Sequence, residues 1–184
     1  MNAPVDVTKI RIETERLILR SWRESDLDDF YEYARVDGVG QMAGWMPHEN
    51  IEKSEQILKM FIEEKKTLAL ELKANGKVIG SLGIEKAPNE PEIAQELLGR
   101  ELGYVLSKQY WGMGLMPEAV RAVIDYCLDI LNYDYLACAH FVWNRQSRRC
   151  IEKSGFLFLK EIKHETRYGT VEDTRLYILY NPNK

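Results

Sequence analysis

The chain has 184 residues, 45% of them hydrophobic, with ten Tyr and four Trp, so it can bury a core in one compact domain without disulfide or metal support. A net charge of −4 argues against nucleic acid as the main partner and weakly favours a cationic or amine substrate. The three cysteines form no Cys-x-x-Cys pair and there are three histidines, which predicts reduced, buried thiols and no zinc site. Without a signal-peptide pattern or an apolar run of about twenty residues, we expect a soluble cytoplasmic protein that does not bind membranes.

The first part of the chain predicts one strand and two helices. Residues 1–9 carry no pattern and predict a loose start, and residues 17–19 form a short β-like run. Apolar residues at helical spacing predict a helix over 25–37. A glycine-broken loop at 38–48 separates it from a second helical pattern over 51–62.

An antiparallel hairpin and a third strand come next. Residues 67–73 and 78–84 read as strands around Asn75-Gly76, a dipeptide typical of tight hairpin turns. Another strand is expected at 101–106.

Helices and strands alternate over the rest of the chain. An apolar stripe predicts a helix over 116–131, and a buried strand follows at 135–142. A short helix over 146–154 precedes a closing hairpin that begins at Phe156 and returns over 171–180. The order predicts a three-layer α/β/α domain, with a mixed sheet between helices.

The stretch between the strand at 101–106 and its following helix reads QYWGMGL, from Gln109 to Leu115. Gly112 and Gly114, one residue apart before a helix start, let the backbone bend and turn successive N–H groups outward, where the helix dipole favours an anion. The stretch therefore predicts a phosphate cradle, although many helices begin after a glycine turn that binds nothing.

A second stretch, Asn144-x-x-Ser147, opens the short helix, and Gly155-Phe156 follows its end. In a purely structural interpretation Asn144 is an N-cap, Gly155 a C-cap and Phe156 a core residue. Both stretches, however, follow a strand and precede a helix, so parallel strands would bring the two helix starts to one edge of the sheet, where α/β proteins bind ligands.

The two stretches together resemble a known family. Gln109-x-x-Gly112-x-Gly114 resembles the pyrophosphate-binding signature of the GNAT superfamily of acetyl-CoA-dependent N-acetyltransferases, and Asn144-x-x-Ser147 with Gly155-Phe156 resembles its second acyl-CoA motif. The segments TERLILR, ELGY and EKSGF are similar to the Rim-type (RimJ/RimL-like) branch, named for enzymes that acetylate ribosomal-protein N-termini.

This similarity spans roughly residues 12–180, the core of an expected single N-acetyltransferase domain over 1–184. It implies the GNAT (acyl-CoA N-acyltransferase) fold, with a mostly antiparallel seven-stranded sheet and a central, splayed parallel pair. It also implies acetyl-CoA as co-substrate and no metal. Pyrophosphate would bind backbone N–H groups of residues 111–115, and the pantetheine arm would lie along the strand at 101–106. The implied coenzyme-binding residues are Leu102, Tyr104, Val105, Leu106, Gln109, Trp111, Gly112, Met113, Gly114, Leu115, Asn144 and Ser147.

Acetyl transfer to an amine needs a base for the ammonium proton and a donor for the leaving thiolate. Many relatives use a tyrosine as the general acid, at the position where this chain has Ile151. By resemblance, Ser147 then becomes the candidate donor near the sulfur. The candidate bases are Glu101, which shares a strand face with Gly103 and Val105, and Glu165, which resembles a glutamate in the loop between the last two strands of Rim-type enzymes. In the structural interpretation, Glu101 caps a strand edge and Glu165 is solvated surface.

The acceptor would enter between the loop at 38–48 and the last hairpin, because the early helices of this fold lie over that side. The candidate lining residues are Trp45, Met46, Tyr104, Trp143, Arg167 and Tyr168. Trp45 and Met46 could equally be core packing under a loop.

The leading interpretation is acetylation of a primary amine, most readily a protein N-terminal α-amine of the ribosomal-protein type, by direct attack in a ternary complex. Small-molecule amines, such as an aminoglycoside, a polyamine or a nucleotide-sugar amine, remain open on this fold. A non-catalytic acyl-CoA-binding module is the alternative from another class, and an α/β protein that binds no coenzyme is a third. Both monomer and homodimer are compatible with the sequence.

Overall fold

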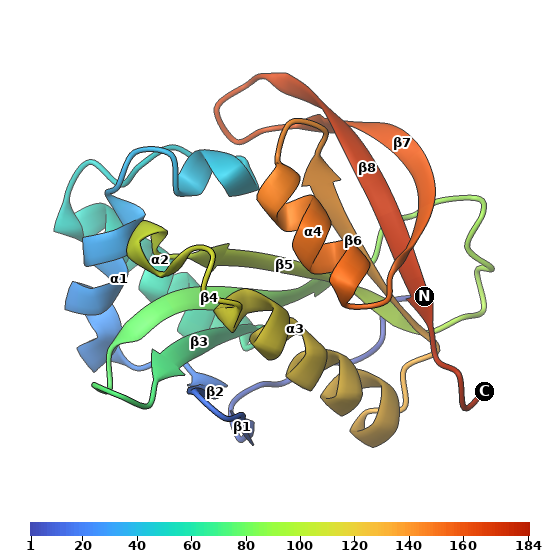
Figure 1. Ribbon diagram of the computed structural model, residues 1–184, viewed down its shortest axis with the longest axis horizontal. Coiled ribbons are helices and arrows are strands. Elements are labelled where there is room, and N and C mark those ends of the chain that lie inside the picture. The colour runs from blue at the N-terminus through green and yellow to red at the C-terminus, as the bar shows by residue number, and fades with distance from the viewer.

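The computed structural model describes residues 1–184 and contains one eight-stranded mixed sheet, in the order β1-β2-β3-β4-β5-β6-β8-β7 (Figure 1). The strands are β1 (Arg11–Glu13), β2 (Leu17–Ser21), β3 (Thr67–Leu72), β4 (Val78–Lys86), β5 (Gly99–Leu106), β6 (Tyr135–Phe141), β7 (Leu157–Glu165) and β8 (Val171–Tyr180). The helices are α1 (Leu27–Ala34), α2 (Ile51–Glu64), α3 (Leu115–Asp125) and α4 (Arg145–Lys153). No helix is long and apolar enough to span a membrane.

Helices cover both faces of the sheet, as the sequence predicts. The larger core cluster joins α3 and α4 to one face, with Val120 and Ile151 packed near strand residues such as Leu102. The second cluster joins α1 and α2 to the other face, where Phe30 and Val105 belong to it. The three-layer α/β/α architecture and the predicted order of helices are therefore confirmed.

The sheet has one strand more than the predicted seven. The extra strand, β1, is three residues long, largely exposed, and pairs antiparallel with β2. Its sequence, Arg-Ile-Glu, is too short to show the alternation that identifies a strand. Pairing with an adjacent edge decides its conformation instead.

The predicted loose start was wrong. Ala3 and Val7 are buried in the main core, and the Ala3 N–H donates to the Gly99 carbonyl at 3.2 Å. The segment thus runs beside the beginning of β5. Isolated apolar residues without a period gave no signal, because their burial depends on a strand almost a hundred residues away.

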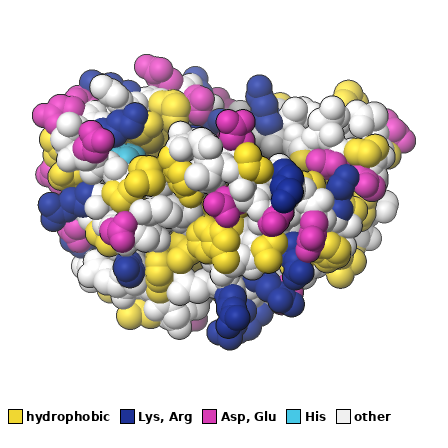
Figure 2. All heavy atoms as spheres, turned by 90° about the horizontal axis from the view of Figure 1, so that it is seen from above, with side chains coloured by type: hydrophobic (Ala, Val, Ile, Leu, Met, Phe, Trp, Pro, Cys, Tyr) yellow, Lys and Arg dark blue, Asp and Glu magenta, His cyan; other side chains and the backbone are white.

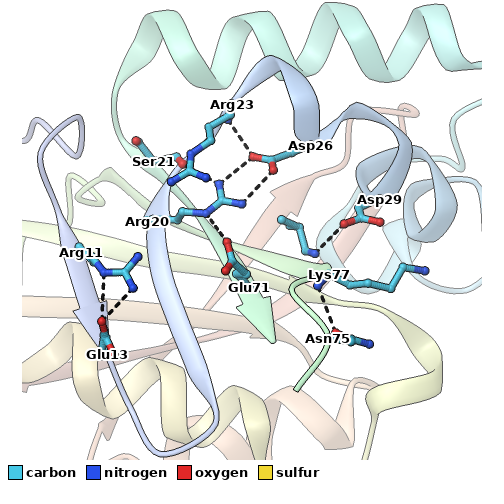
Figure 3. A network of polar contacts seen from close by, with 11 residues as sticks. Arg11, Glu13, Arg20, Ser21, Arg23, Asp26, Asp29, Glu71, Asn75 and Lys77 are labelled. Carbon is cyan, nitrogen blue, oxygen red and sulfur yellow. Dashed lines mark hydrogen bonds and ion pairs between the residues drawn. The ribbon is translucent and has the colours of Figure 1, made fainter. Parts of the chain in front are cut away.

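A buried ion-pair network fixes the connection from β2 to α1 (Figure 3). Arg20 is 5% exposed, and its guanidinium pairs with Asp26 at 2.8 Å and with Glu71 of β3 at 2.6 Å. Asp26 also accepts the Arg23 N–H at 2.8 Å. A buried guanidinium needs such partners to offset its desolvation, and here they tie the residue before α1 to β2 and β3.

The helix predicted over 116–131 is α-helical only as far as Asp125 and continues as a π-turn over Tyr126–Ile130. Such wider turns are usually short insertions within α-helices.

Candidate active site

The central parallel strands open into a V. β5 and β6 pair only from Gly99–Tyr135 to Leu102–Cys138, and both strands then continue without pairing to each other, to Leu106 and Phe141. The predicted splay is thus confirmed. Residues 103–106 of β5 have no strand partner on the β6 side, which leaves backbone groups there for an extended ligand.

A cleft of about 370 Å³ lies beside this opening, between β5, the loop before α3, and α4. It is lined by Val39, Met42, Tyr104, Val105, Leu106, Tyr110, Trp111, Gly112, Gly114, Leu115, Met116, Pro117, Asn144, Gln146, Ser147, Arg149, Cys150 and Lys153. Nine of the predicted coenzyme-binding residues are among them. Leu102, Gln109 and Met113 are not; Leu102 is buried in the core and Met113 is 55% exposed.

The glycine loop adopts the conformation that its composition predicts. Gly112 and Gly114 have φ values of +78° and +76°, in the left-handed region that other residues rarely occupy, and Gly114 is the N-cap of α3. The consecutive N–H groups from Gly112 to Met116 donate to no acceptor within the chain. Five free donors at the start of an α-helix form a site that fits the negative charge of a pyrophosphate.

The side chains of Trp111 and Arg16 hold the two ends of the glycine loop. The Trp111 indole N–H donates to the Leu106 carbonyl at 2.8 Å, which folds the loop back on the end of β5. Lys108 lies 5.9 Å from the centre of the Trp111 ring. At the other end Arg16 donates to the Met113 carbonyl at 2.9 Å. Gln109 is exposed beside these anchors.

Asn144 has the structural role that its position suggests, and it also lines the cleft. Its Oδ1 accepts the Ser147 N–H at 3.1 Å, which caps α4, and its Nδ2 donates to the Met42 carbonyl at 3.2 Å. The side chain is only 5% exposed. It therefore ties the start of α4 to the short 3₁₀ segment Gly40–Ala43.

Ser147 meets a phenol from β5. The Tyr104 hydroxyl lies 3.0 Å from Ser147 Oγ and 3.3 Å from the Ser147 carbonyl oxygen. Burial raises the pKa of Tyr104 well above its ordinary value, so the phenol stays protonated at neutral pH. Ile151, at the position where the resemblance implies a tyrosine in many relatives, is fully buried in the core and does not line the cleft.

Glu101 lies beside the last paired residues of β5 and β6. Strand alternation places it with Val105 on the α1/α2 face of the sheet, opposite Tyr104. Burial raises its pKa to about 7, and the carboxylate of Glu85, its direct cross-strand neighbour, adds to the shift. Glu85 itself pairs with Lys66 at 2.8 Å. Glu101 does not line the cleft.

Glu165 is exposed at the end of β7, where it pairs with Val171. The turn beyond it touches the early loop, because the Arg167 N–H donates to the Gly44 carbonyl at 2.8 Å. The tip of the β7–β8 hairpin and residues 40–44 therefore form adjoining walls.

The predicted acceptor residues divide into two groups. Trp45 packs against the α1/α2 core and lies 5.1 Å from the His48 ring, as ordinary packing would have it. Met46 is 54% exposed and Trp143 is 47% exposed. Tyr168 is partly buried at the hairpin tip. Figure 2 views the molecule from the top of Figure 1, where the β7–β8 tip lies. It shows acidic and basic side chains interspersed with apolar ones.

Some residues at the site escaped the sequence reasoning. Arg149 and Lys153 of α4 line the cleft and add positive charge near the glycine loop. Their signal was the basic run in that helix, which alone is typical of a solvated face. Phe141 stacks 5.3 Å from Trp143, and the Trp143 indole N–H donates to Glu172 at 2.9 Å. The contact with Glu172 depends on the pairing of β6 with β8, which no local motif encodes.

Comparison with known proteins agrees with this geometry. A family model described as the acetyltransferase (GNAT) domain matches residues 16–157. The uncharacterized N-acetyltransferase YoaA of Bacillus subtilis is 25% identical over 181 residues, 94% of this chain and 98% of its own length. A GNAT acetyltransferase structure from Bacillus anthracis superposes with a TM-score of 0.81 at 18% identity, covering 94% of this chain and 99% of its own.

The ribosomal-protein-S5-alanine acetyltransferase of Vibrio fischeri superposes with a TM-score of 0.74 at 23% identity, covering 95% of this chain and 98% of its own. Similarity at this level of identity shows a shared fold. The family match itself extends over most of the chain, from the TERL segment past α4. The chain therefore belongs to the GNAT family of acetyltransferases.

Proposed function

We propose that this acyltransferase moves an acetyl group from acetyl-CoA to a primary amine, with a protein N-terminal α-amine of the ribosomal-protein type as the favoured acceptor. The observation that carries the coenzyme assignment is the row of five free N–H groups from Gly112 to Met116 at the mouth of the cleft. The N-terminal acceptor is supported by the structural similarity to the Vibrio fischeri enzyme.

Acetyl-CoA supplies an activated acyl group, and this chain's own residues supply placement and proton handling. The loop from Trp111 to Leu115 would hold the pyrophosphate, and the unpaired edge of β5 would hold the pantetheine arm. Arg149 and Lys153 would add positive charge along the cleft wall.

Proton transfer would involve groups on opposite faces of the sheet. Glu101, with its pKa raised to about 7, is the proposed base for the amine on the α1/α2 face. Ser147, held by Tyr104 on the α3/α4 face, is the proposed hydrogen-bond donor to the departing sulfur. Glu165 is a weaker candidate for the base, because it is exposed at the end of β7.

Release of free thiol from acetyl-CoA tests the proposal. The acceptors would be peptides with different N-terminal residues, the same peptides with blocked N-termini, a polyamine and an aminoglycoside. Faster turnover with free peptide N-termini than with blocked ones supports the proposed acceptor, and preference for a small amine replaces it. Saturable acetyl-CoA binding with no transfer to any acceptor would instead support a non-catalytic acyl-CoA module. A lack of thermal stabilisation by millimolar acetyl-CoA would refute the coenzyme site, since ligand at about 100 times Kd adds roughly 2.7 kcal/mol.

A further inference from the structure

A residue from the start of the chain reaches the back of the glycine loop. The Arg16 guanidinium donates through Nη1 to the Met113 carbonyl at 2.9 Å and through Nε to Glu118 Oε2 at 2.8 Å. Its Nη2 lies 3.6 Å from the position that a Cβ on Gly114 would occupy. Arg16 does not line the cleft, so these contacts act on the loop and leave the reacting atoms untouched.

Glu118, in the first turn of α3, completes this attachment. Its Oε1 accepts the Arg16 backbone N–H at 2.9 Å and the Thr14 hydroxyl at 2.6 Å. The Thr14 carbonyl in turn accepts from Lys73 at 2.6 Å. The turn between β1 and β2 is therefore fixed to α3 and to the β3–β4 connection, and it presents Arg16 in one orientation.

The contact with the Met113 carbonyl determines where the next N–H group points. In a trans peptide the C=O of Met113 and the N–H of Gly114 point in opposite directions. A peptide next to glycine can flip at low cost, because glycine tolerates both signs of φ. Arg16 holds the Met113 carbonyl on its own side of the loop. The Gly114 N–H therefore points away from Arg16, in line with the other free N–H groups.

We propose that Arg16 is a positioning residue for coenzyme binding, which locks the Met113–Gly114 peptide in the orientation that receives the pyrophosphate. The proposal rests on the proposed function. It also assigns a role to the TERL segment, because Arg16 lies almost a hundred residues before the glycine loop in the sequence but contacts it in the fold.

The test compares two acetyl donors that share the thioester and the pantetheine arm: acetyl-CoA, and S-acetylpantetheine, which lacks the pyrophosphate and the phosphoadenosine attached to it. Arg16→Ala is expected to lower kcat/KM for acetyl-CoA about 10- to 100-fold, the effect of losing charge-assisted hydrogen bonds, and to leave kcat/KM for S-acetylpantetheine unchanged. Arg16→Lys keeps the charge but not the planar fork, so its loss should be intermediate. Arg11→Ala is the matched control, because Arg11 lies in the same hairpin and pairs only with the exposed Glu13.

Three results would overturn the proposal. They are an equal loss with both donors in Arg16→Ala, no loss with acetyl-CoA, and a comparable loss in Arg11→Ala. Circular dichroism checks the fold; if Arg16→Ala does not fold, Arg16→Lys and Arg16→Gln give the same comparison of donors. Failure of the proposed function looks different, because the wild-type protein would then neither bind nor turn over acetyl-CoA.

Discussion

The glycine loop and the acceptor wall are built in different ways. The loop from Gly112 to Met116 works through backbone N–H groups, and its shape follows from two glycines with positive φ and a helix that starts at Leu115. The acceptor wall is assembled from residues 40–46, the β6–α4 connection and the β7–β8 tip, which lie far apart in the sequence.

The segments of the acceptor wall are hydrogen-bonded to one another through both side chains and backbone groups. The Trp143 indole donates to Glu172, Asn144 donates to the Met42 carbonyl, and Arg167 donates its N–H to Gly44. A backbone site can therefore be identified from a few consecutive residues, whereas a side-chain wall needs the folded structure. This difference also explains why the coenzyme is better defined than the acceptor.

The largest effect is expected at Gly112. Gly112→Glu would place a carboxylate at the proposed pyrophosphate site and would force a non-glycine residue into φ +78°. We expect acetyl-CoA affinity to fall by at least about 1000-fold, because like charges repel and the loop donors are redirected. Isothermal titration with acetyl-CoA measures this directly.

Gly76→Glu is the matched control for that variant. Gly76 has φ +73° in the β3–β4 turn, and a Cβ at either glycine meets no atom within 4 Å. Both variants should therefore lose a similar amount of stability, of order 1–2 kcal/mol, from backbone strain alone. Equal acetyl-CoA affinity in the two variants would show that the glycine loop is not part of the binding site.

A smaller loss is expected when the proposed base is neutralised. Glu101→Gln should lower the rate of transfer about 100-fold at pH 8, where the wild-type carboxylate is ionised and can accept a proton. At pH 5 the wild-type group is protonated, so the two rates should converge. Glu165→Gln should leave the rate unchanged; a large loss there instead would move the base to the hairpin.

The same substitution should raise stability. The pKa of Glu101 is raised in the folded protein to about 7, so its favourable contribution is present at low pH and is lost as pH rises through 7. At pH 8 the ionised Glu101 side chain destabilises the folded state, whereas a neutral glutamine does not. Glu101→Gln should therefore increase the free energy of unfolding by about 1–3 kcal/mol. Urea unfolding at pH 5 and pH 8 tests the sign, and a variant no more stable than wild type at pH 8 would contradict a raised pKa of Glu101 in the folded protein.

Much of the fold could be predicted because its signals are local. Asn75-Gly76 marks a hairpin, and the apolar stripe of α3 has a helical period. The start of the chain could not, since Ala3 and Val7 become core residues only beside β5. At the site, the role of Gly112 was predictable because its backbone conformation needs glycine. The raised pKa of Glu101 depends first on its burial in the folded sheet and then on Glu85 in the neighbouring strand, which no local motif encodes.

The predicted hydrogen bond to the sulfur can be tested through its support. Tyr104→Phe removes the hydroxyl that lies 3.0 Å from Ser147 Oγ but keeps the ring in place. We expect kcat to fall about 10-fold, with acetyl-CoA affinity nearly unchanged, because the serine hydroxyl loses its orientation. Ser147→Ala should cost a similar amount, and the double variant no more than either single one. Additive losses would show that the two side chains act separately; Tyr110→Phe, in the same cleft, is the control.

The smallest effect tests the acceptor wall. Trp143 is 47% exposed, stacks on Phe141 and donates to Glu172. If it contacts the acceptor, Trp143→Ala should raise KM for the acceptor about three- to tenfold and leave KM for acetyl-CoA unchanged, because a partly exposed aromatic contact contributes on the order of 1 kcal/mol. Trp143→Phe keeps a ring but loses the indole N–H, so it separates stacking from the hydrogen bond. Steady-state kinetics with both substrates varied gives the two constants. An unchanged acceptor KM in Trp143→Ala would show that Trp143 does not contact the acceptor. Met46 and Tyr168, on the other two segments of the acceptor wall, would then be the residues to test.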